Sequence, residues 1–257
     1  MFSKIVQRCA LPLLRQRKLQ KTATITDASR CLSMSHPKLS EPKPSKEVAL
    51  AAIQAHVKKG MGSESTVKLY DDIAGNYERY LDTLEYSAPT QLARIVTRLA
   101  GDNQDIKIID VGAGSGLGGV ALAGAGFKNI DCLDASQGLL NKAKEKGVYT
   151  NFFCHFLGDQ RLPIPDKSYD MVTICAAMGE NHIPKSGFKD IIRIVKPGGY
   201  VVNVFREEAQ RVPWYEEGLV PFMKQLEKDG VWKELVREIF PNFLPGLDGI
   251  TLVHEVL

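Results

Sequence analysis

The segment from 106 to 119 constrains the fold more than any other part of this chain. Its sequence, Ile-Lys-Ile-Ile-Asp-Val-Gly-Ala-Gly-Ser-Gly-Leu-Gly-Gly, begins as an apolar, β-branched run and then opens into glycines. This pattern is typical of a buried strand that ends in a tight turn before a helix. Because Gly112, Gly114 and Gly116 have no Cβ, the backbone can take unusual φ and ψ values there and a ligand can approach it closely.

Asp110 adds a negative charge to the end of the same strand. A loop that binds phosphate is expected to avoid such a charge, because the carboxylate repels the ligand. A ligand that carries a cationic ammonium or sulfonium group is attracted by it. The segment therefore favours a ligand with a positive charge close to the glycine turn.

Strands and helices alternate after residue 106, which predicts a parallel sheet with helices on both faces. The expected strands are 106–111, 129–134, 152–157, 169–175 and 200–205, and the expected helices are 117–125, 136–146 and 186–195. The last stretch, about 233–257, is expected to form a helix, a strand, a turn at 245–249 and a strand over 250–257.

The chain before the sheet predicts three helices and a targeting segment. Ser45 is expected to cap a short helix through Val57, a second helix runs from Val67 through Tyr80, and a third covers 89–99. The predicted organisation is a targeting or disordered segment over 1–34, a linker with a short helix over 35–65, and one catalytic domain over 66–257.

The first 34 residues are rich in arginine and contain a single acidic residue, Asp27. This composition resembles a mitochondrial transit peptide, and the apolar stretch is too short and broken for a secretory signal. The alternatives are a basic tail without a targeting role, or a start at Met34 that bypasses the segment. We predict a mitochondrial location, with the cytoplasm as the alternative.

Charge and cysteine content exclude several classes of protein. Residues 46–257 carry 24 basic and 28 acidic side chains, so nucleic acid gains little long-range attraction to this part. No apolar run reaches the roughly 18 residues that a membrane span needs. The five cysteines have no C-x-x-C pair, so we expect reduced thiols and neither a disulfide framework nor a metal site.

Asp134 ends the second expected strand, 20 to 22 residues after the glycine turn. A carboxylate at this place can accept hydrogen bonds from both hydroxyls of a ribose. A dinucleotide site has the same features, and Gly114-Ser-Gly-Leu-Gly-Gly119 also matches Gly-x-Gly-x-x-Gly. The glycines and this acid therefore leave a nicotinamide cofactor and a sulfonium cofactor both open.

Three further segments separate the two cofactors: Asp110 before the turn, 158–163 after the third strand, and Lys196-Pro-Gly-Gly before the fifth. With this ordered set the chain resembles the class I S-adenosylmethionine-dependent methyltransferases over about residues 66–257. Additional segments are similar to one branch of that class, and these are Tyr70 to Tyr77, Leu133 to Leu140 and Tyr215 to Leu235.

The resemblance implies an α/β fold with a Rossmann-like, doubly wound sheet of seven strands. The sheet is mostly parallel, with an antiparallel hairpin at the C-terminus. The implied cofactor is S-adenosyl-L-methionine. The residues implied to contact its methionine moiety are Asp110, Gly112, Gly114 and Gly116, and the residue implied to contact its ribose is Asp134. The implied adenine contacts are Ala135, Asp159 and the main chain of Gln160. Tyr77 is implied to close the site, and Cys175, at the end of the fourth strand, is implied to contact the cofactor as well.

Methyl transfer from a sulfonium needs a base only when the acceptor must lose a proton. His182 is the candidate base, because its ordinary pKa lies close to neutral pH. The fourth strand ends in Cys-Ala-Ala-Met and lacks Asn/Asp-Pro-Pro-Tyr, which the class often uses on amide or base nitrogens. We therefore predict a small-molecule acceptor and no nucleic-acid partner, and the oligomeric state is left open.

Two other classes of function remain open from the sequence. One is an S-adenosylmethionine-binding protein without its own catalysis, which the lack of an obvious catalytic residue favours. The other is a nicotinamide-dependent oxidoreductase, which predicts binding of NAD(H) in place of S-adenosylhomocysteine. Fold alone does not decide between such functions.

Overall fold

The computed structural model of the chain describes residues 43–55 and 58–257, all of which belong to the unit His36–Leu257. The predicted targeting segment 1–34 lies outside the described residues. In the part that is described, no helix has both the length and the apolar character that crossing a membrane requires.

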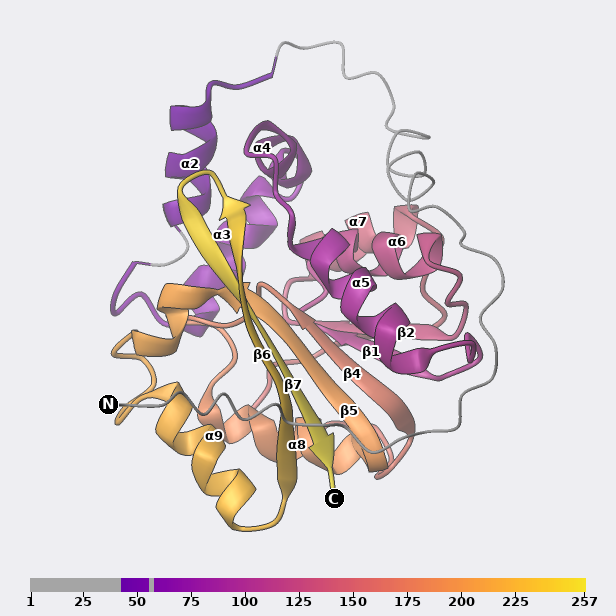
Figure 1. The fold of residues 1–257 in the computed structure, drawn as a ribbon. Helices are drawn as coiled ribbons and strands as arrows, with labels where there is room; N and C mark the ends of the chain where they lie inside the picture. Colours follow the sequence, from indigo (N-terminus) through magenta and orange to yellow (C-terminus); the bar gives the residue numbers. More distant parts are fainter. Residues whose placement is uncertain (1–42, 56–57) are drawn as a thin grey trace, which may run out of the picture. The chain divides into compact units, whose positions relative to one another are not determined.

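A sheet of seven strands forms the centre of this unit (Figure 1). The strand order is β3-β2-β1-β4-β5-β7-β6, and β7 runs antiparallel to both of its neighbours. This confirms the predicted doubly wound sheet with its C-terminal hairpin. The strands are β1 (Ile108–Val111), β2 (Ile130–Asp134), β3 (Phe152–Cys154), β4 (Tyr169–Cys175), β5 (Val195–Arg206), β6 (Trp232–Leu244) and β7 (Leu247–Val256).

Helices cover both faces of the sheet, as Figure 1 shows. Ile108 packs in one apolar cluster, whereas Ile109 packs in a second cluster on the opposite face. Both residues are fully buried, which explains why β1 reads as a continuous apolar run. The first face carries α5 (Ala88–Ala100), α6 (Leu117–Gly124) and α7 (Gln137–Glu145), and the second carries α8 (Phe188–Ile194) and α9 (Leu219–Lys228).

Three short helices precede the sheet: α2 (Lys46–Gln54), α3 (Ser63–Ile73) and α4 (Tyr77–Thr83). Ser45 caps α2 as predicted, because its side chain accepts a hydrogen bond from the backbone N–H of Val48. The prediction of one helix from Val67 through Tyr80 was wrong. Gly75 and Asn76, both weak helix formers, interrupt it, and the chain changes direction between α3 and α4.

The predicted order near the C-terminus also needs correction. The expected helix after residue 233 does not exist, because α9 ends at Lys228 and β6 already begins at Trp232. Leu219, Phe222 and Met223 recur at helical spacing and pack against the second apolar cluster. Residues 233–239 instead alternate between exposed and less exposed positions, the period of a strand at the edge of the sheet.

Candidate functional site

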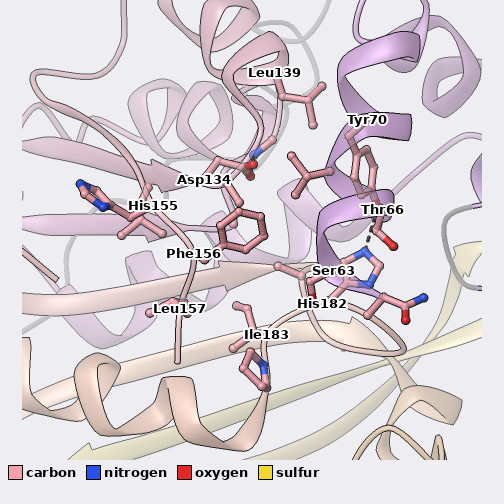
Figure 2. Close-up of a pocket in the computed structure, with 18 of the residues that line it drawn as sticks. Ser63, Thr66, Tyr70, Asp134, Leu139, His155, Phe156, Leu157, His182 and Ile183 are labelled. Carbon is pink, nitrogen blue, oxygen red and sulfur yellow. Dashed lines mark hydrogen bonds between the residues drawn. The ribbon is translucent and has the colours of Figure 1, made fainter. Parts of the chain in front are cut away.

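A cavity of about 340 Å³ lies beyond the carboxyl ends of β1, β2 and β4. This is where open α/β sheets bind their ligands. Figure 2 shows α3 forming one wall, with Tyr70, Thr66 and Ser63, and Asp134 standing on the other side. Of the predicted site residues, the cavity is lined by Tyr77, Gly112, Gly114, Asp134, Ala135, Asp159, Cys175 and His182.

The glycine turn brings the main chain to the cavity because two of its residues take positive φ. Gly112 has φ of 69° and Gly114 has φ of 56°, values that a side chain disfavours. Gly112 also lies against the next strand's loop, since a Cβ on it would stand 2.3 Å from Cβ of Ala177. The N–H groups of Gly112 and Ala113 both donate to the carbonyl of Leu133. The turn is thereby anchored to the end of β2.

Asp134 is the carboxylate that faces the cavity. Its Oδ2 accepts a hydrogen bond from Gly114 N–H and its Oδ1 one from Ser136 N–H, each at 2.8 Å. Burial raises the pKa of Asp134, and these backbone hydrogen bonds oppose that rise. Each carboxylate oxygen has a second acceptor position, so the pair fits two vicinal hydroxyls of a ribose.

Asp110, which is predicted to lie beside the methionine moiety, is not among the residues that line the cavity. Its side chain is fully buried on the α6 side of the sheet and accepts hydrogen bonds from Tyr149 Oη at 2.7 Å and Thr173 Oγ1 at 3.0 Å. Tyr149 in turn accepts the N–H of Gly119 at 3.0 Å. Asp110 therefore supports the start of α6 from below, and its charge acts on the cavity only at a distance.

Gly116 and Gln160 also lie outside the lining. Gly116 has φ of 93° and is packed against Ala143 and Tyr149, so it serves the close approach of α6 and α7. The side chain of Gln160 is exposed. The cavity lining also includes Phe156, which is not among the predicted site residues.

Phe156 enters the cavity because β3 is shorter than predicted. The strand ends at Cys154, and the chain then turns so that 155–157 line the cavity together with Asp159. In Figure 2 the ring of Phe156 lies between Asp134 and Ile183. A partly exposed aromatic ring at this place offers a flat apolar surface for a purine. A lone phenylalanine next to a strand end carries no sequence signal for such a role.

His182 lines the cavity and forms a hydrogen-bonded pair with Tyr70. Its Nδ1 lies 2.6 Å from the carbonyl oxygen of Glu180, so Nδ1 carries the proton and donates it. In the neutral ring Nε2 is then an acceptor, and it lies 2.9 Å from Oη of Tyr70 (Figure 2). Burial raises the pKa of Tyr70, so this phenol stays protonated and donates to His182.

Two further predicted residues stand beside this pair. Tyr77 packs edge-on against Tyr70 with 5.7 Å between ring centroids, and burial raises its pKa. Cys175 lines the cavity at the end of β4 and lies 3.6 Å from Oη of Tyr86. Burial raises the pKa of the Cys175 thiol to about 12, so it is a neutral, weakly polar part of the wall.

Hydrogen bonds clamp the segment before α3 onto the loop after β4. The side chain of Glu180 accepts the N–H of Gly60 at 3.4 Å, and Asn181 Oδ1 accepts the N–H of Gly62 at 3.1 Å. Asn181 Nδ2 also donates to the carbonyl of Lys58 at 2.8 Å. Asn181 takes a φ of 61°, which places its side chain against this segment. The clamp thus holds this segment against the loop that carries His182.

The sheet order, the glycine turn and the carboxylate at the end of β2 are the features of an α/β protein that binds a nucleoside at the carboxyl ends of its strands. A family model described as a methyltransferase domain matches residues 109–203. The chain belongs to the class I S-adenosylmethionine-dependent methyltransferases, and its methyl donor is S-adenosylmethionine. The nicotinamide alternative, which the glycine spacing left open, is not supported.

Within this class the chain is similar to methyltransferase-like protein 27 of Homo sapiens, with 30% identity over 192 residues, 73% of this chain and 78% of that protein. It is also 30% identical over 140 residues to a demethylmenaquinone methyltransferase of Renibacterium salmoninarum, covering 54% of this chain and 57% of that protein. A TehB-like methyltransferase structure from Corynebacterium glutamicum superposes with a TM-score of 0.52 at 18% identity, over 72% of this chain and 98% of that one, and shows the shared fold.

The free energy of unfolding is expected to depend on pH through Asp110. Burial raises the pKa of this carboxyl from 3.8 to about 6, although its bonds from Tyr149 and Thr173 oppose the rise. The folded protein thus holds the proton more tightly than the unfolded chain. The resulting stabilisation is complete below pH 3.8 and is lost as the pH rises through about 6. Its size is on the order of 3 kcal/mol.

Urea unfolding across this pH window measures the effect. The wild type is expected to lose stability as the pH rises, and Asp110→Asn is expected to show a flatter profile because residue 110 no longer titrates. The substitution also lowers the free energy of unfolding by a constant amount, because asparagine replaces one hydrogen-bond acceptor by a donor. This constant cancels when the slopes of the free energy of unfolding against pH are compared. Parallel profiles for the two proteins would contradict the assignment.

Proposed function

We propose that this methyltransferase acts on a small molecule by direct, in-line transfer. The observation that carries the proposal is the clamp between 58–62 and the loop after β4, the loop that also carries His182. Because the clamp holds an additional segment against this loop, we expect it to hinder the approach of a folded macromolecule more than that of a small molecule. Demethylmenaquinone, for which one relative is named, is itself a small molecule.

When bound, S-adenosylmethionine supplies a methyl group on a positively charged sulfur, which is already a good leaving group. The chain has to hold both reactants in line and keep water out, and such positioning is worth about 7–11 kcal/mol of the barrier. Asp134 and the glycine turn hold the donor from one side of the cavity. The side chains of α3 and the loop after β4 enclose the reacting end from the other.

We further propose that Tyr70 and His182 remove the proton when the acceptor is a hydroxyl. Nε2 of His182 is held toward Tyr70 because the opposite ring nitrogen donates to Glu180. The acceptor's hydroxyl donates to Oη of Tyr70, and Tyr70 passes its own proton to Nε2. His182 is then the base, and Tyr70 is the group that touches the acceptor.

Replacing Tyr70 by phenylalanine, or His182 by glutamine, is expected to lower kcat by at least about 100-fold, the scale of general-base catalysis. The double variant is expected to lose little more than either single one, because the two side chains act as one unit. The pH dependence of kcat is expected to flatten at its acidic side. Tyr80→Phe, which removes a hydroxyl from α4 outside the cavity lining, is the matched control. Unchanged kcat in both variants would remove the pair from the mechanism.

The proposed activity is tested by incubating residues 35–257 with radiolabelled donor and a small-molecule extract, beside a protein and an RNA extract. Label is expected only in the small-molecule fraction, and its isolation gives the acceptor for the kinetic measurements above. Label in protein or RNA would contradict a small-molecule acceptor. Donor binding without transfer to any fraction would favour the non-catalytic alternative.

We also propose that residues 1–34 direct the protein to mitochondria, which their arginine-rich, acid-poor composition supports. A fluorescent protein fused to the C-terminus is expected to label mitochondria, and removal of 1–34 is expected to leave the signal diffuse. Diffuse signal from the full-length fusion would end this proposal.

A further inference from the structure

A second, smaller cavity of about 60 Å³ adjoins the donor cavity. The two share four lining residues: Tyr70, Tyr77, Ala176 and His182. The proposed proton-transfer pair therefore lies where the two cavities meet, and a molecule in the second cavity can contact Tyr70.

Three parts of the chain, far apart in sequence, build this cavity from apolar side chains. Leu50 comes from α2, Leu81 from α4, and Leu244 and Leu247 from the tip of the β6–β7 hairpin. Figure 1 shows the hairpin reaching up between α2 and α4. Hydrogen bonds from Ser87 to the carbonyls of Asn242 and Phe243 fasten the tip to the start of α5.

Arg206 is the only arginine, lysine, aspartate or glutamate among the described residues that line the second cavity. Its side chain is 18% exposed, and Nη1 pairs at 2.9 Å with Glu208, whose side chain is 51% exposed. In the described part of the chain the guanidinium donates to no other group. The cation thus faces an apolar space while its counter-charge lies in solvent.

Arg206 also interacts electrostatically with Tyr70, the residue proposed to contact the acceptor. Burial raises the pKa of Tyr70 most, the charge of Asp134 raises it further, and the charge of Arg206 lowers it by a smaller amount. Tyr70 therefore lies within the fields of both groups, one in each cavity. An anionic group beside Arg206 gains a charge-assisted hydrogen bond in a place largely shielded from water.

We infer that the second cavity binds the methyl acceptor, and that the acceptor is an apolar hydroxy acid whose carboxylate or similar anion pairs with Arg206. This inference rests on the proposed small-molecule function. The apolar body lies against the leucines, and the hydroxyl meets Tyr70. The acceptor oxygen bonds to the methyl carbon as the carbon–sulfur bond breaks, the sulfur keeps the electron pair, and the hydroxyl proton passes through Tyr70 to Nε2 of His182.

Benzoate, benzamide and benzylamine test the charge preference, because they share an apolar ring and differ in charge. Each is titrated by ligand-observed NMR into protein saturated with S-adenosylhomocysteine. Benzoate is expected to bind at least tenfold more tightly than the other two. Arg206→Gln is expected to abolish this preference, whereas Arg211→Gln, an exposed arginine paired with Glu207 in the same short helix, is expected to retain it.

Filling the cavity provides a second test. Leu247→Trp is expected to abolish benzoate binding and leave the affinity for S-adenosylhomocysteine unchanged. Leu235→Trp, at an exposed position on β6, is the matched control and is expected to change neither.

The outcomes separate the inference from the function on which it rests. Equal affinity for the three probes, or a preference that survives Arg206→Gln, overturns the inference while donor binding stands. Benzoate binding that survives Leu247→Trp places the probe elsewhere and overturns the inference as well. Failure of the wild type to bind S-adenosylhomocysteine overturns the proposed function itself.

Discussion

Replacing Asp134 by alanine is expected to weaken the binding of S-adenosylhomocysteine by at least about 100-fold. The carboxylate is the proposed acceptor for the ribose hydroxyls, and hydrogen bonds to a charged group contribute about 1.5–3 kcal/mol each. It also orients the glycine turn, since Gly114 and Ser136 both donate to it. Loss of the side chain therefore removes ligand contacts and leaves two backbone N–H groups without their acceptor.

Isothermal titration calorimetry measures this loss, and Asp134→Asn is the matched control. Asparagine keeps the shape and one acceptor oxygen, so its affinity is expected to fall between those of the wild type and alanine variant. The urea midpoint of each variant shows whether the fold is intact. An alanine variant that is folded and binds with wild-type affinity would remove Asp134 from the donor site.

Replacing Gly112 by alanine is expected to have the largest effect on stability, a loss of about 2–5 kcal/mol. Two costs add at this position. A non-glycine residue at φ of 69° costs about 1–2 kcal/mol. In addition, the new methyl group would lie 2.3 Å from Cβ of Ala177, so the turn or the end of β4 must move.

Gly147→Ala separates the two costs, because Gly147 has a similar φ of 66° and a Cβ added there would have no atom within 4 Å. Urea unfolding is expected to show a loss of about 1–2 kcal/mol there and the larger loss at Gly112. Donor affinity is expected to fall only in Gly112→Ala. Equal losses at the two positions would show that the contact with Ala177 has no energetic role.

The donor half of the site could be predicted because its parts are close in sequence. Gly112 and Gly114 directly follow β1, and Asp134 ends the next strand along the chain. Parallel strands joined by one helix lie side by side, so their carboxyl ends meet without any further information. The apolar run and the glycines that follow it were enough to place the turn.

The orientation of the Asp110 side chain could not be predicted in the same way. Its place at a strand end led to a predicted position facing the ligand, but side chains alternate between the two faces of a strand. Asp110 lies on the same face as Ile108, where Tyr149 and Thr173 reach it. The side chain is held on this face by Tyr149 and Thr173, which are 39 and 63 residues away in the sequence. The residues next to Asp110 therefore do not reveal its hydrogen-bond partners.

The sequence by itself determined the sheet, the glycine turn and the place of the Asp134 carboxylate at the strand end, because strand periodicity and chain connectivity are local properties. The tertiary structure decided which residues meet on the proposed acceptor side, where His182 is the residue that the sequence had already indicated. Tyr70, His182, Arg206 and Leu247 come from four separate elements and meet only when the N-terminal helices and the hairpin close over the strand ends. Their proximity arises from packing between distant segments, and such packing leaves no spacing that can be read along the chain.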